Sequence, residues 1–432
     1  MSILIINIKQ IVQVERDMYS LRRGGGEMSV LDTINNGFIF IEGDSIRELG
    51  EMPGVASGGV KSLIERFGGE SRVGEIIDAT DKFVFPSYCD SHTHLVYAGS
   101  REGEFTDKIR GLTYQEIAKR GGGILNSAAL LHQTSEDELY RQSIERAWEI
   151  IAHGTGAVEI KSGYGLNTND ELKMLKVAKR IAESTPLSVK STFLGAHAVP
   201  EEFRGRREEY VNEIISVMIP LVATEELAEY IDVFTEEGFF SVEDTDRIFN
   251  AAIKYGLRPK IHANQMSFSG GVGVAVKYNA ISADHLEFTA EREFDLLLKN
   301  ETVATLLPGS TFFLEMEYAP ARKMINHGLT VALATNYNPG SSPYSDMKFI
   351  MGLAALKMKM TPEEVINAAT LNGAAAMGLS ETHGTIAKGK TANLFITRPI
   401  PSYSFIPYAL TTPVVETVIL NGTVVNVNDR VF

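Results

Sequence analysis

The stretch Phe85-Pro86-Ser87-Tyr88-Cys89-Asp90-Ser91-His92-Thr93-His94 decides the fold of this chain. We interpret it as a strand that ends in two histidines two positions apart. Side chains two positions apart on a strand lie on the same face, so both imidazoles are expected to point the same way. Two neutral imidazoles that converge on one point suit a divalent metal ion. His-x-His alone is a weak signal, because exposed or packed histidines also occur at this spacing.

From residue 84 onward, short apolar segments alternate with segments of helical periodicity. Strands that alternate with helices imply a parallel sheet, and eight such units imply an α/β fold, a closed (βα)8 barrel of the TIM type. We expect the eight strands to end near His94, Lys161, His197, Glu236, His262, His285, Pro308 and Asn336.

Residues that favour helix ends punctuate the segments between these strands. Thr168-x-x-Glu171 predicts a capping box that opens a helix over Leu172–Ile181. Thr361-Pro362-Glu363-Glu364 combines a cap, a proline at the first helical position and a glutamate at the third. Ser135–Ala152 is amphipathic, and Gly154 suits its C-terminal end.

Both ends of the chain carry strand signals. Ile3–Val14 is β-branched and apolar, and near the other end Val414–Leu420 and Thr423–Val427 flank Asn421-Gly422. Asn-Gly fits the type I′ turn of a two-residue hairpin. The simplest arrangement joins both ends in one small β domain.

Length and composition bound the remaining possibilities. A chain of 432 residues exceeds one simple domain. We expect a barrel over residues 84–383 and a small β-sandwich domain composed of residues 1–83 and 384–432. A homodimer is compatible with the sequence, which isolates no contact face.

The charge balance and the cysteine count exclude several classes of protein. The 41 basic and 55 acidic side chains give a net charge of −14, which argues against nucleic-acid or anionic-membrane partners. The single cysteine cannot form an intramolecular disulfide. No segment approaches the ~18 apolar residues of a membrane span, so we expect a cytoplasmic protein.

Five of the nine histidines fall at or near the ends of predicted barrel strands. His197, His262 and His285 join His92 and His94 on the C-terminal rim of the barrel. Active sites of such barrels lie on this rim. The sequence therefore predicts a metal-dependent active site there.

Two motifs resemble the metal-dependent amidohydrolase superfamily. Residues 85–94 look like its first-strand motif, and Gly384-Thr385-Ile386 with Gly389–Leu394 resembles the motif of its closing β domain. Further blocks are similar to one branch of the superfamily, whose members open a small cyclic amide that carries a propanoate chain. These blocks are Gly99–Glu102, Gly121–Ile124, Glu159–Gly165, Phe193–Ala198, Ser282–Glu287 and Asn338–Ser342.

The resemblance implies one divalent metal ion per chain, zinc or iron. Its implied ligands are His92, His94 and His262, with a fourth at the end of strand eight, the place of Asn336. Catalytic roles are implied for His285, which is placed to donate or relay protons, and for Gln265. The positions that the resemblance assigns to the small-molecule substrate are Arg101, Tyr114, Tyr164, His197, Gln265, Asn338, Gly340 and Ser341.

Ordinary structural roles compete with these assignments. Arg101 can grip a carboxylate through two parallel hydrogen bonds, but it could equally pair with Glu102 or Glu104. The tyrosines could be packed aromatics, and the glutamine could cap a loop. We expect a structural role for Lys161 and interpret Cys89 as a small buried hydrophobe.

Asn336 departs from the superfamily pattern, which has aspartate there. An asparagine oxygen binds zinc or iron more weakly and cannot accept a proton from water. Asn264 and Asn393 are milder departures of the same kind. Two hypotheses stay open, an active hydrolase and a catalytically impaired relative. A third, deamination of a purine-like ring, is disfavoured by Arg101 and Asn338-Pro339-Gly340, because such substrates lack the carboxylate.

Overall fold

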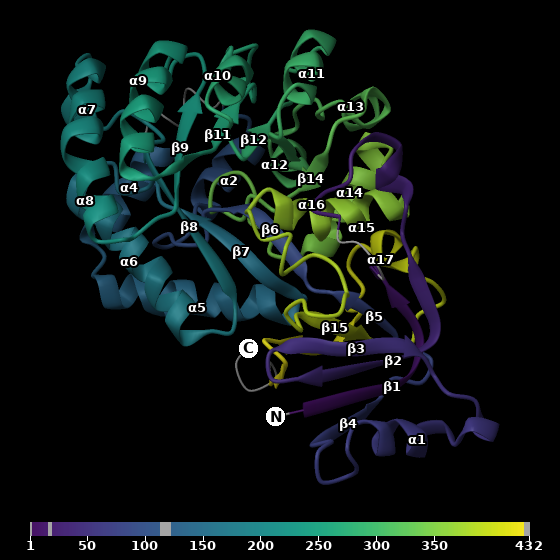
Figure 1. Ribbon diagram of the computed structural model, residues 1–432. Coiled ribbons are helices and arrows are strands. Elements are labelled where there is room, and N and C mark those ends of the chain that lie inside the picture. The colour runs from purple at the N-terminus through teal and green to yellow at the C-terminus, as the bar shows by residue number, and fades with distance from the viewer. Residues whose placement is uncertain (1, 16–19, 113–121, 427–432) are drawn as a thin grey trace.

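The structure is a computed structural model that describes residues 2–15, 20–112 and 122–426 (Figure 1). A barrel of eight parallel strands is surrounded by helices, and a second sheet from the terminal segments lies at one side. This confirms the predicted fold class. The barrel strands are β6 (Tyr88–Thr93), β7 (Thr155–Lys161), β8 (Ser188–Ala196), β9 (Tyr230–Thr235), β11 (Ile261–Ala263), β12 (Ser282–His285), β13 (Val303–Leu306) and β14 (Val331–Leu333).

Each barrel strand ends within three residues of its predicted place. Neighbouring strands follow chain order from β6 to β14, and the short strand β10 (Arg258–Pro259) pairs with β9. Beyond β14 the chain closes the barrel against β6. Thr93 forms a parallel bridge with Tyr337, and the His94 amide donates to the Tyr337 carbonyl at 2.9 Å.

Helices cover the outside of the barrel, and the largest apolar cluster lies between them and the strands. These helices are α2 (Glu102–Ile109), α4 (Ile124–Gln133), α5 (Glu136–Ala152), α6 (Thr168–Ser184), α7 (Arg207–Glu213), α8 (Ile219–Thr224), α9 (Val242–Ala252), α10 (Gly271–Lys277), α11 (Glu291–Leu298), α12 (Pro308–Leu314), α13 (Ala321–His327), α14 (Met347–Met358), α15 (Pro362–Ala369) and α16 (Leu371–Ala375).

Two predicted helix boundaries are confirmed. Thr361 is the N-cap of α15 and forms a capping box with Glu364, with proline at the helix start. Ser135 caps α5 by accepting a hydrogen bond from the Glu138 amide. Gly154, with a φ of 94°, follows that helix in the left-handed conformation that ends many helices.

The predicted capping box at Thr168 is wrong. Asn167 is the N-cap of α6, and its side-chain oxygen accepts a 2.9 Å hydrogen bond from the Asp170 amide. Glu171 is buried and instead accepts hydrogen bonds from the backbone amides of Gly163 and Gly165. Asn and Thr are both favoured N-cap residues. The Glu171 carboxylate does not take part in a capping box because it binds backbone amides of the loop that follows β7.

The terminal segments form one sheet in the order β17-β16-β15-β5-β1-β2-β3, with β4 paired to β1. Antiparallel pairing of Phe85 with Phe395 joins the two ends of the chain. The strands are β1 (Ser2–Val12), β2 (Thr33–Glu42), β3 (Ser45–Glu51), β4 (Glu75–Asp78), β5 (Phe83–Pro86), β15 (Leu394–Thr397), β16 (Val415–Leu420) and β17 (Thr423–Val425).

This sheet curves so that distant strands share one core. Ile39 on β2 and Ile419 on β16 belong to the same buried cluster, although these strands are not neighbours. The β16–β17 hairpin has φ values of 49° at Asn421 and 69° at Gly422, as the predicted type I′ turn requires. Helices α1 (Gly59–Arg66) and α17 (Phe405–Tyr408) and the 3-10 helices η1 (Gly25–Ser29) and η2 (Val55–Ser57) complete the described elements of these segments. The domain boundaries at 83/84 and 383/384 remain predictions.

Within the described ranges, no helix combines the length and the apolar character that crossing a bilayer demands.

Candidate active site

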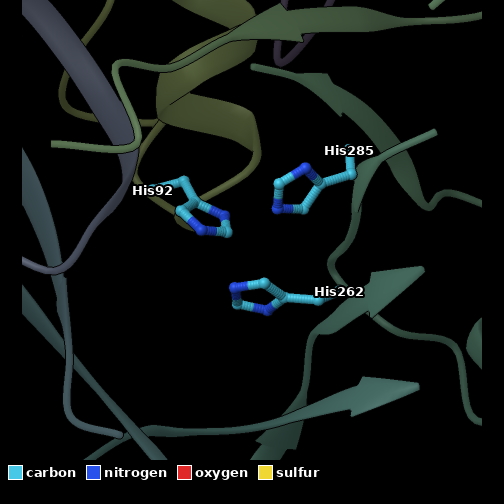
Figure 2. Close-up of side chains that lie close together, drawn as sticks. All are labelled: His92, His262 and His285. Carbon is cyan, nitrogen blue, oxygen red and sulfur yellow. The ribbon is translucent and has the colours of Figure 1, made fainter. Parts of the chain in front are cut away.

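Five imidazoles meet at the C-terminal mouth of the barrel. The ring centroids of His92 and His262 lie 4.5 Å apart, and that of His285 lies 5.8 Å and 5.4 Å from them. Figure 2 shows these three rings turned toward one another from three strands. The His94 ring lies 5.6 Å from that of His262 and 5.1 Å from that of His197. The structure therefore brings all five predicted histidines into one cluster.

Two triplets within this cluster have the spacing of a metal site. In one, nitrogens of His92, His262 and His285 lie within 4.8 Å of one another, and in the other those of His94, His197 and His262 do so. The predicted set of His92, His94 and His262 takes members from both triplets. His262 is common to them, so it occupies the centre of the histidine cluster.

The predicted ligand atoms are buried without a hydrogen-bond partner among the described residues. They are Nε2 of His92 and His262, Nδ1 of His94 and Oδ1 of Asn336. A buried polar atom left unpaired costs about 1–3 kcal/mol. Four such atoms at one place fit a divalent cation, because imidazole nitrogen and amide oxygen can both ligate such an ion.

Burial keeps these imidazoles neutral. It lowers the pKa of His92 and His94 well below the usual value, and neighbouring imidazoles add to the effect. Burial also lowers the pKa of His197 to about 3 and that of His262, which the Asp232 carboxylate partly offsets. A neutral imidazole is the form that binds a metal ion.

Two aspartates that the sequence interpretation missed hold the far side of two imidazoles. Asp284 Oδ2 lies 2.6 Å from Nδ1 of His92, and Asp232 Oδ2 lies 3.0 Å from Nδ1 of His262. A carboxylate only accepts, so each Nδ1 is the donor and each Nε2 is bare. The sequence signal for them was their position: Asp284 directly precedes His285 on β12, and Asp232 lies on β9, the neighbour of β11.

The end of strand eight wraps around Asn338. Asn336 has a left-handed φ of 52°, and its carbonyl accepts a 2.6 Å hydrogen bond from the Asn338 side chain. The side-chain oxygen of Asn338 accepts from the amides of Gly340 and Ser341, both at 2.8 Å. Asn338 thus holds the loop that positions its neighbours.

His285 is held in a strained conformation. It has a φ of 85° and Leu286 one of 65°, so β12 ends in two consecutive left-handed residues. Such residues cost about 1–3 kcal/mol each and cluster at functional sites. Nδ1 of His285 lies 3.6 Å from Glu287 Oε2, beyond hydrogen-bond distance.

A cavity of about 310 Å³ opens beside the histidine cluster. Of the predicted residues it is lined by His94, Arg101, Tyr164, His197, His262, Gln265, His285, Asn336, Asn338, Gly340 and Ser341. His92 lies behind the wall, and Tyr114 falls outside the described residues. The cavity also has an apolar wall, which the sequence did not predict and which consists of Ile124, Phe234, Phe239, Met266, Leu314 and Met316.

Arg101 forms the ion pair with Glu104 that the sequence allowed and also lines the cavity, while its role toward a carboxylate stays a prediction. It lines the cavity, and its guanidinium pairs with Glu104, with Nη2 at 2.6 Å and Nε at 2.9 Å from Oε2. Gly340 leaves room for this group, because a β-carbon there would lie 1.9 Å from Arg101 Nη1. Glu104 therefore orients the guanidinium against the loop that follows strand eight.

Local structure explains one departure from the superfamily pattern. The buried Asn264 donates through Nδ2 to the Phe288 carbonyl at 2.8 Å and accepts through Oδ1 from Ser269. An aspartate could not make the donated bond. Nearby, Glu236 accepts from the Met266 amide and so holds the loop that carries Gln265.

Comparison with known proteins assigns the chain to a family. Residues 83–425 match the model of the amidohydrolase family. The chain is 51% identical over 422 residues to the imidazolonepropionase of Flavobacterium johnsoniae, covering 98% of this chain and 99% of that one. The chain belongs to the imidazolonepropionase family of amidohydrolases. The imidazolonepropionases of Christiangramia forsetii and Clostridium tetani are 50% and 41% identical to it, covering 98% and 93% of this chain and 100% and 93% of theirs.

Solved structures share the fold of this imidazolonepropionase-family chain at low identity. A triazine hydrolase variant has a TM-score of 0.75 and 15% identity, covering 99% of this chain and 97% of that one. Guanine deaminase of E. coli has a TM-score of 0.71 and 13% identity, covering 99% of both chains. Identity this low concerns the fold alone, and the individual site roles stay predictions.

Proposed function

We propose that this chain hydrolyses the cyclic amide bond of 4-imidazolone-5-propanoate to N-formimidoyl-L-glutamate, a step of histidine degradation. The observation that carries this proposal is the cavity, in which a paired arginine and a cluster of buried imidazoles line the same space. That combination suits a substrate with a carboxylate and a polar ring. The relatives named imidazolonepropionase support it over nearly their full length.

One divalent ion, zinc or iron, is proposed to be held by His92, His94, His262 and Asn336. Their unpartnered atoms support this assignment. When bound, such an ion supplies Lewis acidity and lowers the pKa of a coordinated water to about 7. Asn336 contributes an oxygen without a negative charge.

Arg101 is proposed to bind the propanoate carboxylate. Its guanidinium can form parallel charge-assisted hydrogen bonds, and Glu104 fixes its plane. Tyr164 and His197, whose rings lie 5.5 Å apart on the same wall, face the polar edge of the substrate ring. This arrangement holds the ring amide beside the histidine cluster.

His285 is proposed to move the proton. Water oxygen bonds to the ring carbonyl carbon and the ring C–N bond breaks. The proton that His285 takes from water passes to the leaving nitrogen. Gln265 and Asn336 have neutral amides, so they can hydrogen-bond the reactants but cannot take this proton.

The test is a direct assay. The purified protein is analysed for zinc and iron per chain, and loss of the imidazolone absorbance is followed with and without a chelator. We expect one metal equivalent and an activity that the chelator abolishes. An undetectable rate with metal bound would favour the catalytically impaired alternative instead.

We also propose a cytoplasmic location, supported by the single cysteine, and a homodimer remains a prediction.

A further inference from the structure

Five charged side chains are buried together inside the barrel, behind the histidine cluster. We name this group the buried charge cluster; its members are Glu159, Lys161, Asp232, Lys260 and Asp284, each with an exposed fraction of 0%. They come from β7, β9 and β12, with Lys260 directly before β11. Charged side chains rarely lie this deep unless they are paired.

Lys161 connects the two aspartates that touch predicted metal ligands. Its Nζ lies 2.7 Å from Asp232 Oδ2 and 3.5 Å from Asp284 Oδ2. The same two oxygens face Nδ1 of His262 and of His92. One ammonium group therefore lies between both carboxylates that hold an imidazole.

A further hydrogen bond, to Glu159, holds the Lys161 side chain in place. Its Nζ donates to Glu159 Oε1 at 2.6 Å, and Thr192 donates to the same oxygen at 2.5 Å. The other oxygen of Glu159 accepts from Lys260, which also donates to the carbonyls of Ser91 and Ala376. The position of Lys161 is thus set by contacts on three strands.

We propose that Lys161 is a positioning residue for the metal site. By attracting both carboxylates it directs Asp284 Oδ2 toward His92 and Asp232 Oδ2 toward His262. Each imidazole then keeps its proton on Nδ1 and presents bare Nε2 to the cation. This inference rests on the metal site of the proposed function.

The experiment measures zinc affinity of the full-length chain by competition with a chromophoric chelator. We expect Lys161→Met to weaken zinc binding by about 10–100-fold, the usual effect of losing an outer-shell partner. Lys348→Met is the matched control. Lys348 is also buried, but it donates to the carbonyls of Ala409 and Leu410, outside the buried charge cluster. The zinc affinity of the Lys348→Met variant should stay within about twofold of wild type.

A second measurement separates positioning from general damage to the fold. Histidine ring ¹⁵N shifts of the metal-free chain report which nitrogen carries the proton. We expect Nδ1–H forms of His92 and His262 in the wild type and mixed forms in Lys161→Met. Circular dichroism and cooperative unfolding verify the fold, and Lys161→Gln is measured in the same way if the methionine variant does not fold.

The outcomes are distinct. A folded Lys161→Met or Lys161→Gln variant with wild-type zinc affinity and wild-type ring signals overturns the role of Lys161. Equal weakening in Lys348→Met overturns it as well, because the effect is then a general consequence of losing a buried ammonium group. A wild-type chain that binds no zinc or iron contradicts the proposed metal site itself.

Discussion

The backbone amide of Asn336 donates a 3.0 Å hydrogen bond to the carbonyl oxygen of His92. This bond joins the chain beyond the last barrel strand to the first strand and places the Asn336 side chain beside the imidazoles. Its Oδ1 is buried and has no hydrogen-bond partner among the described residues. This unpartnered oxygen supports the proposal that Asn336 is a metal ligand, although its side chain is neutral.

Asn336→Asp should tighten metal binding by about tenfold or more and raise the hydrolysis rate, because an anionic oxygen is a better ligand than an amide oxygen. Aspartate tolerates the left-handed φ of 52° almost as well as asparagine, so little backbone strain is added. Chelator competition and the imidazolone assay give the two readouts. If neither quantity changes, Asn336 is not a ligand.

His92→Ala should empty the metal site, because it removes an imidazole whose Nε2 faces the histidine cluster. Metal analysis of the purified variant measures this. His132→Ala is the control, since His132 lies on α4 and pairs with Asp170 away from the cluster. Retention of a full metal equivalent by the His92 variant would refute its ligand role.

Arg101→Met should raise KM by about 10–100-fold with a smaller change in kcat, because a hydrogen bond to a charged group contributes about 1.5–3 kcal/mol. Steady-state kinetics measure the two parameters. Arg141→Met serves as control, since Arg141 is exposed on α5 and pairs with Glu138. An unchanged KM would assign Arg101 only to its pair with Glu104.

Gly340→Ala should also raise KM, although Arg101 itself is retained. The added β-carbon would lie 1.9 Å from Arg101 Nη1, so the guanidinium must move. We expect KM to rise by about tenfold or more, a difference of about 1.4 kcal/mol. Gly273→Ala on α10 is the control, because its β-carbon would meet no atom within 4 Å. Equal KM values for both variants would contradict the predicted place of the carboxylate.

His383 should make the folded state sensitive to acid. Burial lowers its pKa to about 4, and its Nε2 lies 2.8 Å from the Ser188 hydroxyl. The unfolded chain binds this proton near the ordinary value of 6.5, so the contribution of His383 to stability is present above that pH and is lost as pH falls toward 4.

His383→Gln tests this dependence. The difference in unfolding free energy between wild type and variant should narrow by about 2 kcal/mol between about pH 7 and about pH 4.5. Urea unfolding at both pH values measures the difference. His153→Gln, at the C-cap of α5, is measured in parallel. A constant difference for the His383 variant would show that this histidine does not titrate as described.

Local sequence determined much of the fold because its signals act over a few residues. The alternation of apolar and helical segments predicted the barrel, and Asn421-Gly422 favoured the turn with two positive φ values that the structure has. Prediction from local sequence failed where two neighbouring residues are equally favourable as N-caps. Asn167 rather than Thr168 caps α6, because the loop after β7 binds the carboxylate of Glu171.

By itself, the sequence determined the barrel, the rim on which five histidines meet and the neutral residue at position 336. These follow from strand spacing, since strand ends of a parallel barrel share one edge. Only the tertiary structure decided which groups touch. The contacts of Asp232 and Asp284 with imidazoles and the central place of Lys161 depend on register between strands far apart in the chain. Register is set by packing of the whole barrel, which no local segment encodes.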